Sequence, residues 1–197
     1  MDQKILKNKI RKEFKDKRSA LDQDQINRES KLICDNFIDN LLPEILLTNK
    51  NPIFAIYLDA NNEVKTSQII QYFKENNIRF CLPKINSNAI DLDYVECDDS
   101  LEFQNNQTYP NLIEPVNGTF IKPNFLIIPL VAYDKSRNRI GMGKGFFDKS
   151  ITQLKAQNSQ IKTIALSYKL QYYDQTIPSE KHDQTIDFIV SSHHILR

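Results

Sequence analysis

The feature of this sequence with the clearest chemical meaning is a cluster of glycines. The chain has only four glycines, and Gly141, Gly143 and Gly145 occupy alternate positions within five residues. Glycine permits positive φ and the close approach of a ligand, so that successive backbone N–H groups can surround a phosphate. Arg139 and Lys144 add cationic donors, one a planar fork and the other a mobile point charge. The segment therefore indicates a phosphate-binding loop.

The loop matches neither of the two best-known phosphate motifs. A P-loop has Ser or Thr after its lysine, but Gly145 follows Lys144 here, and Phe146 stands where a G-x-G-x-x-G motif has its third glycine. The pattern therefore predicts phosphate binding without selecting a nucleotide class. The alternative interpretation is a glycine-rich turn with two solvated cations.

Two aspartates could complete a site for a metal and a nucleotide. Asp148 lies at the start of the helix expected after the loop, and Asp183 follows in the C-terminal segment. Mg²⁺ prefers one or two carboxylates together with phosphate oxygens and water. Taken alone, each aspartate is more commonly a helix cap or a turn residue. We expect no zinc site, because His182, His193 and His194 show no ligand spacing with one another or with a cysteine.

The N-terminal segment is strongly basic. Residues 1–18 hold eight basic and three acidic side chains, and Leu6, Ile10, Phe14 and Leu21 recur at the spacing of one helix face. We expect a helix over residues 3–21 whose other faces are cationic. From the residues alone, a solvated helix face is the simpler interpretation of these charges.

Helical periodicity and apolar runs alternate along the rest of the chain. A second helix is expected from an N-cap at Asp22 or Asp24 to the neighbourhood of Pro43. Further helices are expected around residues 69–73 and over 145–156, and strands over 52–58, 78–82, 125–131, 163–168 and 188–190, with an edge strand at 92–96. Residues 98–124 contain three prolines and a glycine, and are expected to be irregular.

Strands that are apolar on both faces and alternate with helices are typical of a parallel sheet covered by helices. We therefore predict an α/β fold, a single domain of residues 1–197 with a mainly parallel sheet and helices on both faces. The glycine loop follows the strand expected at 125–131 and leads into a helix. This is the position at which such sheets bind ligands.

The composition excludes several classes of protein. With 26 Lys and Arg against 25 Asp and Glu, the chain has no overall attraction to nucleic acid or to an anionic membrane. Cys34, Cys81 and Cys97 are too few and too widely spaced for a metal knuckle, and their odd number argues against a disulfide framework. The N-terminus lacks an apolar leader, and no apolar stretch approaches the roughly 20 residues that span a bilayer. We expect a cytoplasmic protein.

Four blocks of the sequence, in order, resemble the 5-formyltetrahydrofolate cyclo-ligase family. The most specific block joins residues 129–134 to Arg139–Asp148, and it is similar to the family pattern P-x-x-A-[FY]-D followed by R-[LI]-G-x-G-x-G-[FY]-[FY]-D. The other blocks are Lys7–Arg11, the segment from Tyr57 to Glu63, and residues 165–183.

The resemblance implies an ATP- and Mg²⁺-dependent enzyme that cyclises 5-formyltetrahydrofolate to 5,10-methenyltetrahydrofolate. The formyl oxygen would be phosphorylated by ATP, and N10 would then attack the formyl carbon, with ADP and phosphate released. Arg139 and Lys144 would be the catalytic residues, and Asp148 and Asp183 would hold Mg²⁺. ATP would contact Lys7, Asn8, Lys9, Ile10, Arg11, Arg139, Ile140, Gly141, Met142, Gly143, Lys144, Gly145, Phe146 and Phe147. The folate would contact Leu58, Glu63, Met142, Gly143, Lys144, Gly145 and Phe146.

The match to the family has two gaps. Phe146 and Phe147 stand where many members have two tyrosines, so that a ring but no phenolic hydroxyl is present at these positions. Residues 84–124 are largely unmatched.

The resemblance implies small-molecule partners, ATP and the folate, with no nucleic acid and no membrane, and we expect a monomer.

Two alternative functions follow from the same residues. One is a different ATP- or phosphate-dependent enzyme on the same scaffold, because a fold does not determine its chemistry. The other is a nucleic-acid-binding relative that uses the basic helix and has lost catalysis. The joint presence of Arg139, Lys144, Asp148 and Asp183 argues against this second alternative.

Overall fold

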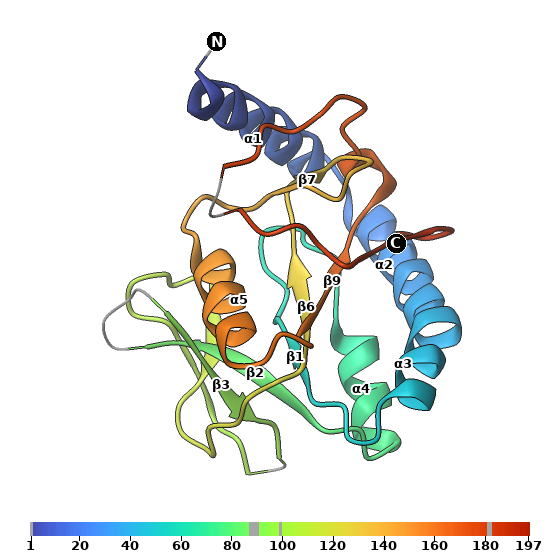
Figure 1. The fold of residues 1–197 in the computed structure, drawn as a ribbon, viewed down its shortest axis with the longest axis vertical. Helices are drawn as coiled ribbons and strands as arrows, with labels where there is room; N and C mark the ends of the chain where they lie inside the picture. The colour runs from blue at the N-terminus through green and yellow to red at the C-terminus, as the bar shows by residue number, and fades with distance from the viewer. Residues whose placement is uncertain (1, 87–90, 99, 181–182) are drawn as a thin grey trace.

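One mainly parallel sheet organises the chain (Figure 1). The computed structural model describes residues 2–86, 91–98, 100–180 and 183–197. Within these residues, seven strands form the sheet in the order β11-β10-β9-β6-β1-β2-β3. They are β1 (Phe54–Ile56), β2 (Phe80–Ile85), β3 (Leu92–Glu96), β6 (Phe125–Pro129), β9 (Lys162–Leu166), β10 (Phe188–Val190) and β11 (Ile195–Leu196). Neighbouring strands from β10 to β2 pair in parallel, and the edge strands β3 and β11 pair antiparallel.

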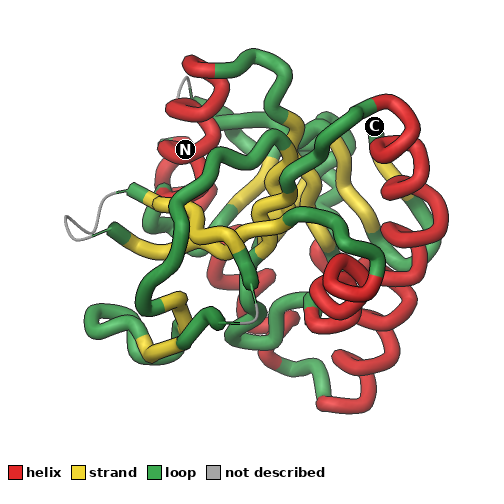
Figure 2. The backbone as a smooth tube through the Cα atoms, turned by 90° about the horizontal axis from the view of Figure 1, so that it is seen from below, coloured by secondary structure: helices red, strands yellow, loops and turns green. Residues whose placement is uncertain are grey.

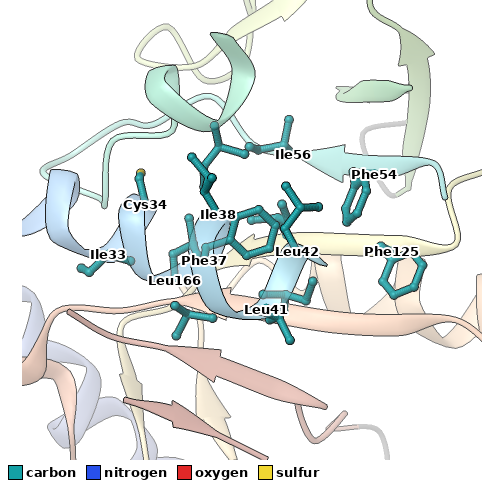
Figure 3. Packing of buried hydrophobic residues seen from close by; sticks show 14 of the residues in the cluster. Ile33, Cys34, Phe37, Ile38, Leu41, Leu42, Phe54, Ile56, Phe125 and Leu166 are labelled. Atoms are coloured by element: carbon teal, nitrogen blue, oxygen red, sulfur yellow. The ribbon is translucent and has the colours of Figure 1, made fainter. Parts of the chain in front are cut away.

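Helices cover both faces of this sheet, as the sequence predicted. Alternate strand residues point to opposite faces. Phe54 and Ile56 pack with α2 (Gln23–Asn36), α3 (Leu42–Thr48) and α4 (Ser67–Glu75), whereas Ala55 packs with α5 (Phe146–Gln157). Figure 2 shows the strands at the centre with helices around them, and Figure 3 shows side chains of α2 and α3 turned toward β1 and β6. Burial on both faces explains why these strands are continuous apolar runs.

Helix α1 (Gln3–Ser19) packs beyond the end of the sheet. The carboxylate of Asp2 accepts a hydrogen bond from the Lys4 N–H and so caps the first turn. Ile10 and Phe14 pack on the segment that follows β6, which includes β7 (Ala132–Tyr133) and β8 (Arg139–Ile140). The apolar stripe therefore holds a cationic helix at the carboxyl edge of the sheet.

The second helix differs from its prediction at its C-terminal end. Asp22 is the N-cap and forms a capping box with Gln25. The helix does not end near Pro43, because a π-helical turn, η1 (Phe37–Leu41), carries it into α3. Pro43 lies in the first turn of α3, where a missing backbone N–H removes no intrahelical hydrogen bond.

Residues 98–124 contain regular structure that the sequence did not predict. Strands β4 (Phe103–Asn105) and β5 (Ile113–Pro115) form an antiparallel hairpin, so the expectation of an irregular segment was wrong there. Strand β11 was not predicted either. The edge strand at residues 92–96 and the strand at 188–190 are confirmed with the predicted bounds.

The remaining predictions from composition concern membranes, thiols and histidines. Among the described residues, no helix is both long and apolar enough to cross a membrane. Cys34 and Cys81 are buried free thiols, and burial raises the pKa of each. His193 and His194 are exposed, and His182 lies outside the described residues.

Candidate active site

The sheet changes its direction of winding between β1 and β6. From β1 the chain passes through α4 to β2 on one side, and from β6 it passes through the glycine loop and α5 to β9 on the other. The carboxyl ends of two such strands leave a crevice between their loops. A cavity of about 880 Å³ occupies this crevice, and it is lined by residues that follow both strands.

The glycine loop forms one wall of the cavity. Gly143 has a φ of +95°, and a Cβ at this position would lie 3.4 Å from Cζ of Arg11. That distance is an ordinary contact, so the positive φ and not a lack of space is what favours glycine at this position. The loop lies against α1, and Nε of Arg11 donates a hydrogen bond to the Gly141 carbonyl at 2.9 Å. Gly145 is the N-cap of α5 with a φ of +76° and offers no side-chain cap. The first N–H groups of α5 are thus available to an anion in the cavity.

Arg139 and Lys144, the two cations of the loop, occupy different environments. Arg139 is buried, and its Nη2 lies 2.6 Å from Oδ1 of Asp148. Burial lowers the pKa of Arg139, and the carboxylates of Asp148 and Asp183 oppose that change. Its Nε has no hydrogen-bond partner among the described residues. Lys144 is exposed, with Nζ 5.3 Å from the ring centroid of Tyr109.

Helix α1 presents a second set of cations to the same cavity. Lys7, Asn8 and Arg11 line it from one helix face, as expected for residues three or four positions apart. Lys9 is exposed and lies away from the cavity lining. Ile10 is buried in the core, against Val131, Ala132, Ile140 and Ile177, and does not line the cavity. Only one face of α1 therefore lines the cavity, and not every residue of the segment Lys7–Arg11.

Lys7 joins α1 to the C-terminal segment. Its Nζ lies 3.1 Å from a carboxylate oxygen of Glu180, and it also pairs with Asp183. Burial lowers the pKa of Lys7, but the hydrogen bonds to Asp183 and Glu180 outweigh burial, and the pKa is raised. The ammonium therefore stays charged and holds Asp183 at the cavity wall.

The two predicted metal ligands, Asp148 and Asp183, both line the cavity. They come from different elements, yet both carboxylates act electrostatically on the same guanidinium, that of Arg139. Two carboxylates beside a glycine loop with accessible backbone N–H groups fit the donor preference of Mg²⁺ when a phosphate supplies further oxygens. The described residues contain no group of three or more His, Cys, Asp or Glu side chains that could hold a metal without a substrate.

The other end of the cavity combines apolar walls with a buried carboxylate. Leu58, Pro83 and Ile85 contribute apolar surface. Glu63 is only 9% exposed, and one of its carboxylate oxygens accepts a hydrogen bond from the Ala60 N–H at 3.1 Å. Burial raises the pKa of Glu63 to about 7, although Arg18 acts to lower it. This carboxyl group is poised to recognise hydrogen-bond donors near neutral pH.

The structure brings all the predicted site residues except Lys9 and Ile10 to the lining of one cavity. Sequence reasoning missed further lining residues, above all residues 108–114, which cover most of the connection between β4 and β5 and the start of β5. Tyr109 in this connection packs edge to face with Phe146, with ring centroids 5.8 Å apart. In the sequence this stretch stands out only by Pro110, which carries no functional signal.

Comparisons with known proteins cover almost the whole chain. Residues 3–192 match the model of the 5-formyltetrahydrofolate cyclo-ligase family. The chain is 28% identical over 192 residues to a mouse 5-formyltetrahydrofolate cyclo-ligase, covering 92% of this chain and 91% of the relative. It is 30% identical over 188 residues to a Mycoplasma genitalium protein of the same name, with 93% and 96% covered.

Two solved structures have the same fold. A 5,10-methenyltetrahydrofolate synthetase from Mycoplasma pneumoniae superimposes with a TM-score of 0.74 at 23% identity, covering 98% of this chain and all of the other. One from Aquifex aeolicus gives a TM-score of 0.79 at 23% identity, with 98% and 92% covered. At this level of identity, the two structures support the fold.

Proposed function

The chain belongs to the 5-formyltetrahydrofolate cyclo-ligase family, and from this premise we propose that it is an ATP- and Mg²⁺-dependent ligase that cyclises 5-formyltetrahydrofolate to 5,10-methenyltetrahydrofolate. The observation that carries the proposal is the division of one cavity into two chemically different ends. One end offers glycine N–H groups and cations, and the other offers apolar walls and a buried carboxylate. The chemistry of the first end suits a polyphosphate, and that of the second end suits a pterin.

The phosphates of ATP would lie between the glycine loop and α1. Gly143 and Gly145 leave their backbone accessible, and Lys7 and Arg11 add positive charge from the opposite wall. The buried Nε of Arg139 supports this assignment, because a buried N–H group without a partner is costly and a phosphate oxygen would satisfy it. We assign no ATP contact to Lys9 or Ile10, because neither lines the cavity.

Asp148 and Asp183 would hold Mg²⁺ beside the phosphates. Their partners, Arg139 and Lys7, are cations that orient each carboxylate before the ligand arrives. When bound, Mg²⁺ supplies charge that neutralises the phosphate oxygens. The protein contributes the two carboxylates and their orientation.

The folate would occupy the opposite end. The carboxylate of Glu63 suits the adjacent N–H donors of a pterin ring, and Leu58, Met142 and Phe146 offer surface for the rings to pack against. Because Phe146 has no hydroxyl, its contribution is packing alone. The formyl group on N5 would then face the phosphate end of the cavity.

The reaction that this arrangement favours has two steps. The formyl oxygen attacks the γ-phosphorus of ATP and ADP leaves. N10 then attacks the formyl carbon, the N10 proton is lost, and the carbon–oxygen bond breaks to release phosphate. Arg139 and Lys144 stabilise negative charge on the transferred group, and a cation fixed in the site does this best in the transition state. Holding N10 close to the formyl carbon removes much of the entropic barrier, so that no dedicated base is required.

We further propose that the enzyme works as a monomer in the cytoplasm. The residues assigned to both substrates come from one chain, and the two buried thiols, Cys34 and Cys81, suit a reducing compartment. Light scattering of the purified protein at assay concentration tests the first point. A stable dimer would contradict it.

The proposal is tested by mixing the purified protein with 5-formyltetrahydrofolate, ATP and Mg²⁺ and following the absorbance of the methenyl product. We expect product only when all three are present, with one ADP and one phosphate formed per methenyl group. ATP consumption without methenyl product would point to a different ATP-dependent enzyme. No turnover of either substrate would contradict the proposal altogether.

A further inference from the structure

Arg18 is a buried arginine that touches three parts of the cavity wall without lining the cavity. It lies in the last turn of α1 and is 2% exposed. Its Nη1 donates to the Leu130 carbonyl at 3.2 Å, and its Nη2 donates to Sδ of Met142 at 3.7 Å. Nη1 also lies 4.0 Å from a carboxylate oxygen of Glu63. Leu130, Met142 and Glu63 all line the cavity.

The three contacts join segments that follow β1 and β6, the two strands whose loops form the crevice. Glu63 belongs to the loop after β1, Leu130 directly follows the strand β6, and Met142 lies in the glycine loop. Arg18 therefore joins the loop after β1 to the glycine loop from outside the cavity lining. A buried guanidinium is costly to desolvate, and an apolar side chain would fill the same space at lower cost. The contacts with Leu130, Met142 and Glu63 are what offset this cost.

Glu63 is the group on which that charge acts. Arg18 favours the ionised form of Glu63, as does the Ala60 N–H, whereas burial and Asp59 oppose it. The other titratable groups close to Glu63 are neutral phenols. Tyr57 feels the charge of Glu63, and Tyr168 donates to the Glu63 backbone carbonyl at 3.0 Å. Among the described residues, Arg18 is the cation that faces this carboxylate.

We propose that Arg18 is a positioning residue for the folate end of the site, which fixes Glu63 relative to Leu130 and Met142 and favours the ionised form of its carboxylate toward the N–H donors of the pterin. The inference rests on the proposed function, because it takes the folate as the ligand that Glu63 faces. Arg18 itself touches no substrate. Its effect must therefore appear through the groups that it contacts, and we assign it to Glu63, the charged one among them.

The test is the variant Arg18→Met, which keeps an apolar stem and removes the charge. We expect the KM for 5-formyltetrahydrofolate at neutral pH to rise about 10-fold, with the KM for ATP within about twofold of wild type. In the wild type the folate KM should fall as pH rises through about 7, where Glu63 ionises. In the variant this fall should move up by about one pH unit, because the cation that favours ionisation is gone.

Two further variants show whether the effect passes through Glu63. In a Glu63→Gln background, the pH dependence of the folate KM should disappear, and adding Arg18→Met should change KM by less than about twofold. Lys17→Met is the matched control, because Lys17 lies on the same turn of α1 but is exposed and pairs with Glu13 at 2.7 Å. It should behave as wild type.

The outcomes separate this inference from the proposed function. A wild type that forms no methenyl product defeats both. An active wild type defeats the role of Arg18 alone if Arg18→Met leaves the folate KM and its pH midpoint unchanged, or raises the KM for ATP equally. If Arg18→Met does not fold, Arg18→Lys decides. It retains the charge but not the planar fork, so we expect the folate KM to rise about threefold at an unchanged pH midpoint, and an unchanged KM would overturn the inference.

Discussion

At the scale of single residues, the site depends on where each charge is buried. Arg139 is enclosed and paired with Asp148, so its position is set before a substrate binds. Lys144 is exposed and rests over the ring of Tyr109, so it can follow charge as it moves. Glu63 is buried with a pKa near 7 and can change its charge under working conditions. The sequence showed these residue types, but their burial depends on the fold.

Lys144→Met should lower kcat while leaving the fold intact. The substitution keeps much of the side-chain length and removes the ammonium, so the transferred phosphoryl group loses one cation. We expect kcat to fall about 10²- to 10³-fold, on the order of 3 to 4 kcal/mol. The folate KM should change little, and steady-state kinetics measures both.

The control for Lys144 is Lys149→Met, an exposed lysine of α5 outside the cavity lining. It should retain normal kinetics. If Lys144→Met kept kcat within about threefold of wild type, under about 1 kcal/mol, Lys144 would be an ordinary solvated loop residue.

Glu63→Gln should stabilise the protein at alkaline pH while weakening folate binding. The folded-state pKa of Glu63, about 7, lies above the ordinary value of 4.5, so the ionised form is disfavoured in the native state. Ionisation of Glu63 therefore lowers the free energy of unfolding of the wild type. This loss is absent below the unfolded-state pKa, grows as pH rises, and is fully present above about 7. We expect the free energy of unfolding to rise by about 1 to 3 kcal/mol at about pH 8.5, with a much smaller rise at about pH 5.

Urea unfolding of the Glu63 variant at the two pH values measures this difference. A stability gain that is equal at both would mean that Glu63 is not ionised in the native protein at alkaline pH. If the variant were less stable than wild type at alkaline pH, the ion pair of Glu63 with Arg18 would stabilise the protein by more than the burial of the carboxylate destabilises it.

At the scale of elements, the sequence predicted what periodicity and glycine placement control. The parallel sheet, α1 and the glycine loop were all found, because apolar runs and helical stripes reflect burial directly. Facing was harder. The family block Lys7–Arg11 was predicted to contact ATP as a continuous segment, but a helix turns Ile10 into the core and leaves Lys9 outside the cavity lining. The hairpin of β4 and β5 escaped notice because its short strands contain no apolar run, and all three residues of β4 are exposed.

Gly145→Ala tests the glycine loop as an element. A φ of +76° is strained for alanine, and nothing lies within 4 Å of the added Cβ, so backbone strain is the only direct effect. We expect a loss of about 1 kcal/mol in unfolding free energy and a weaker ATP affinity, because the first turn of α5 must shift to relieve the strain. Thermal unfolding and ATP titration by calorimetry measure the two effects.

Gly145→Asn is the matched comparison, because asparagine adopts left-handed backbone conformations more readily than alanine. Its stability should lie between that of wild type and that of the alanine variant. Equal losses in both variants would mean that the side chain itself, not the conformation, disturbs the loop.

At the scale of the whole molecule, the cavity is assembled from segments far apart in the chain. Helix α1, the loop after β1, the connection of β4 and β5, the glycine loop and the C-terminal segment all contribute to its lining. The contact between the first and last of these is Lys7 with Glu180 and Asp183. No local pattern could predict it, because the partners are more than 170 residues apart. The N-terminal helix thereby helps to position a proposed metal ligand.

Lys7→Met should therefore affect both stability and the magnesium requirement. The variant leaves Asp183 at the cavity wall without its ammonium partner, so we expect a loss of about 1 to 3 kcal/mol in unfolding free energy and a several-fold higher magnesium concentration for half-maximal activity. Because the pKa of Lys7 is raised above 10.5, its contribution is present throughout the neutral range and is lost only as pH rises through the folded-state pKa. The stability difference from wild type should thus stay constant from about pH 6 to about pH 9. Lys12→Met, an exposed lysine of the same helix, is the control and should match wild type in both measurements. If Lys7→Met lost stability but kept a normal magnesium titration, the lysine would join the ends of the chain without positioning Asp183 for the metal.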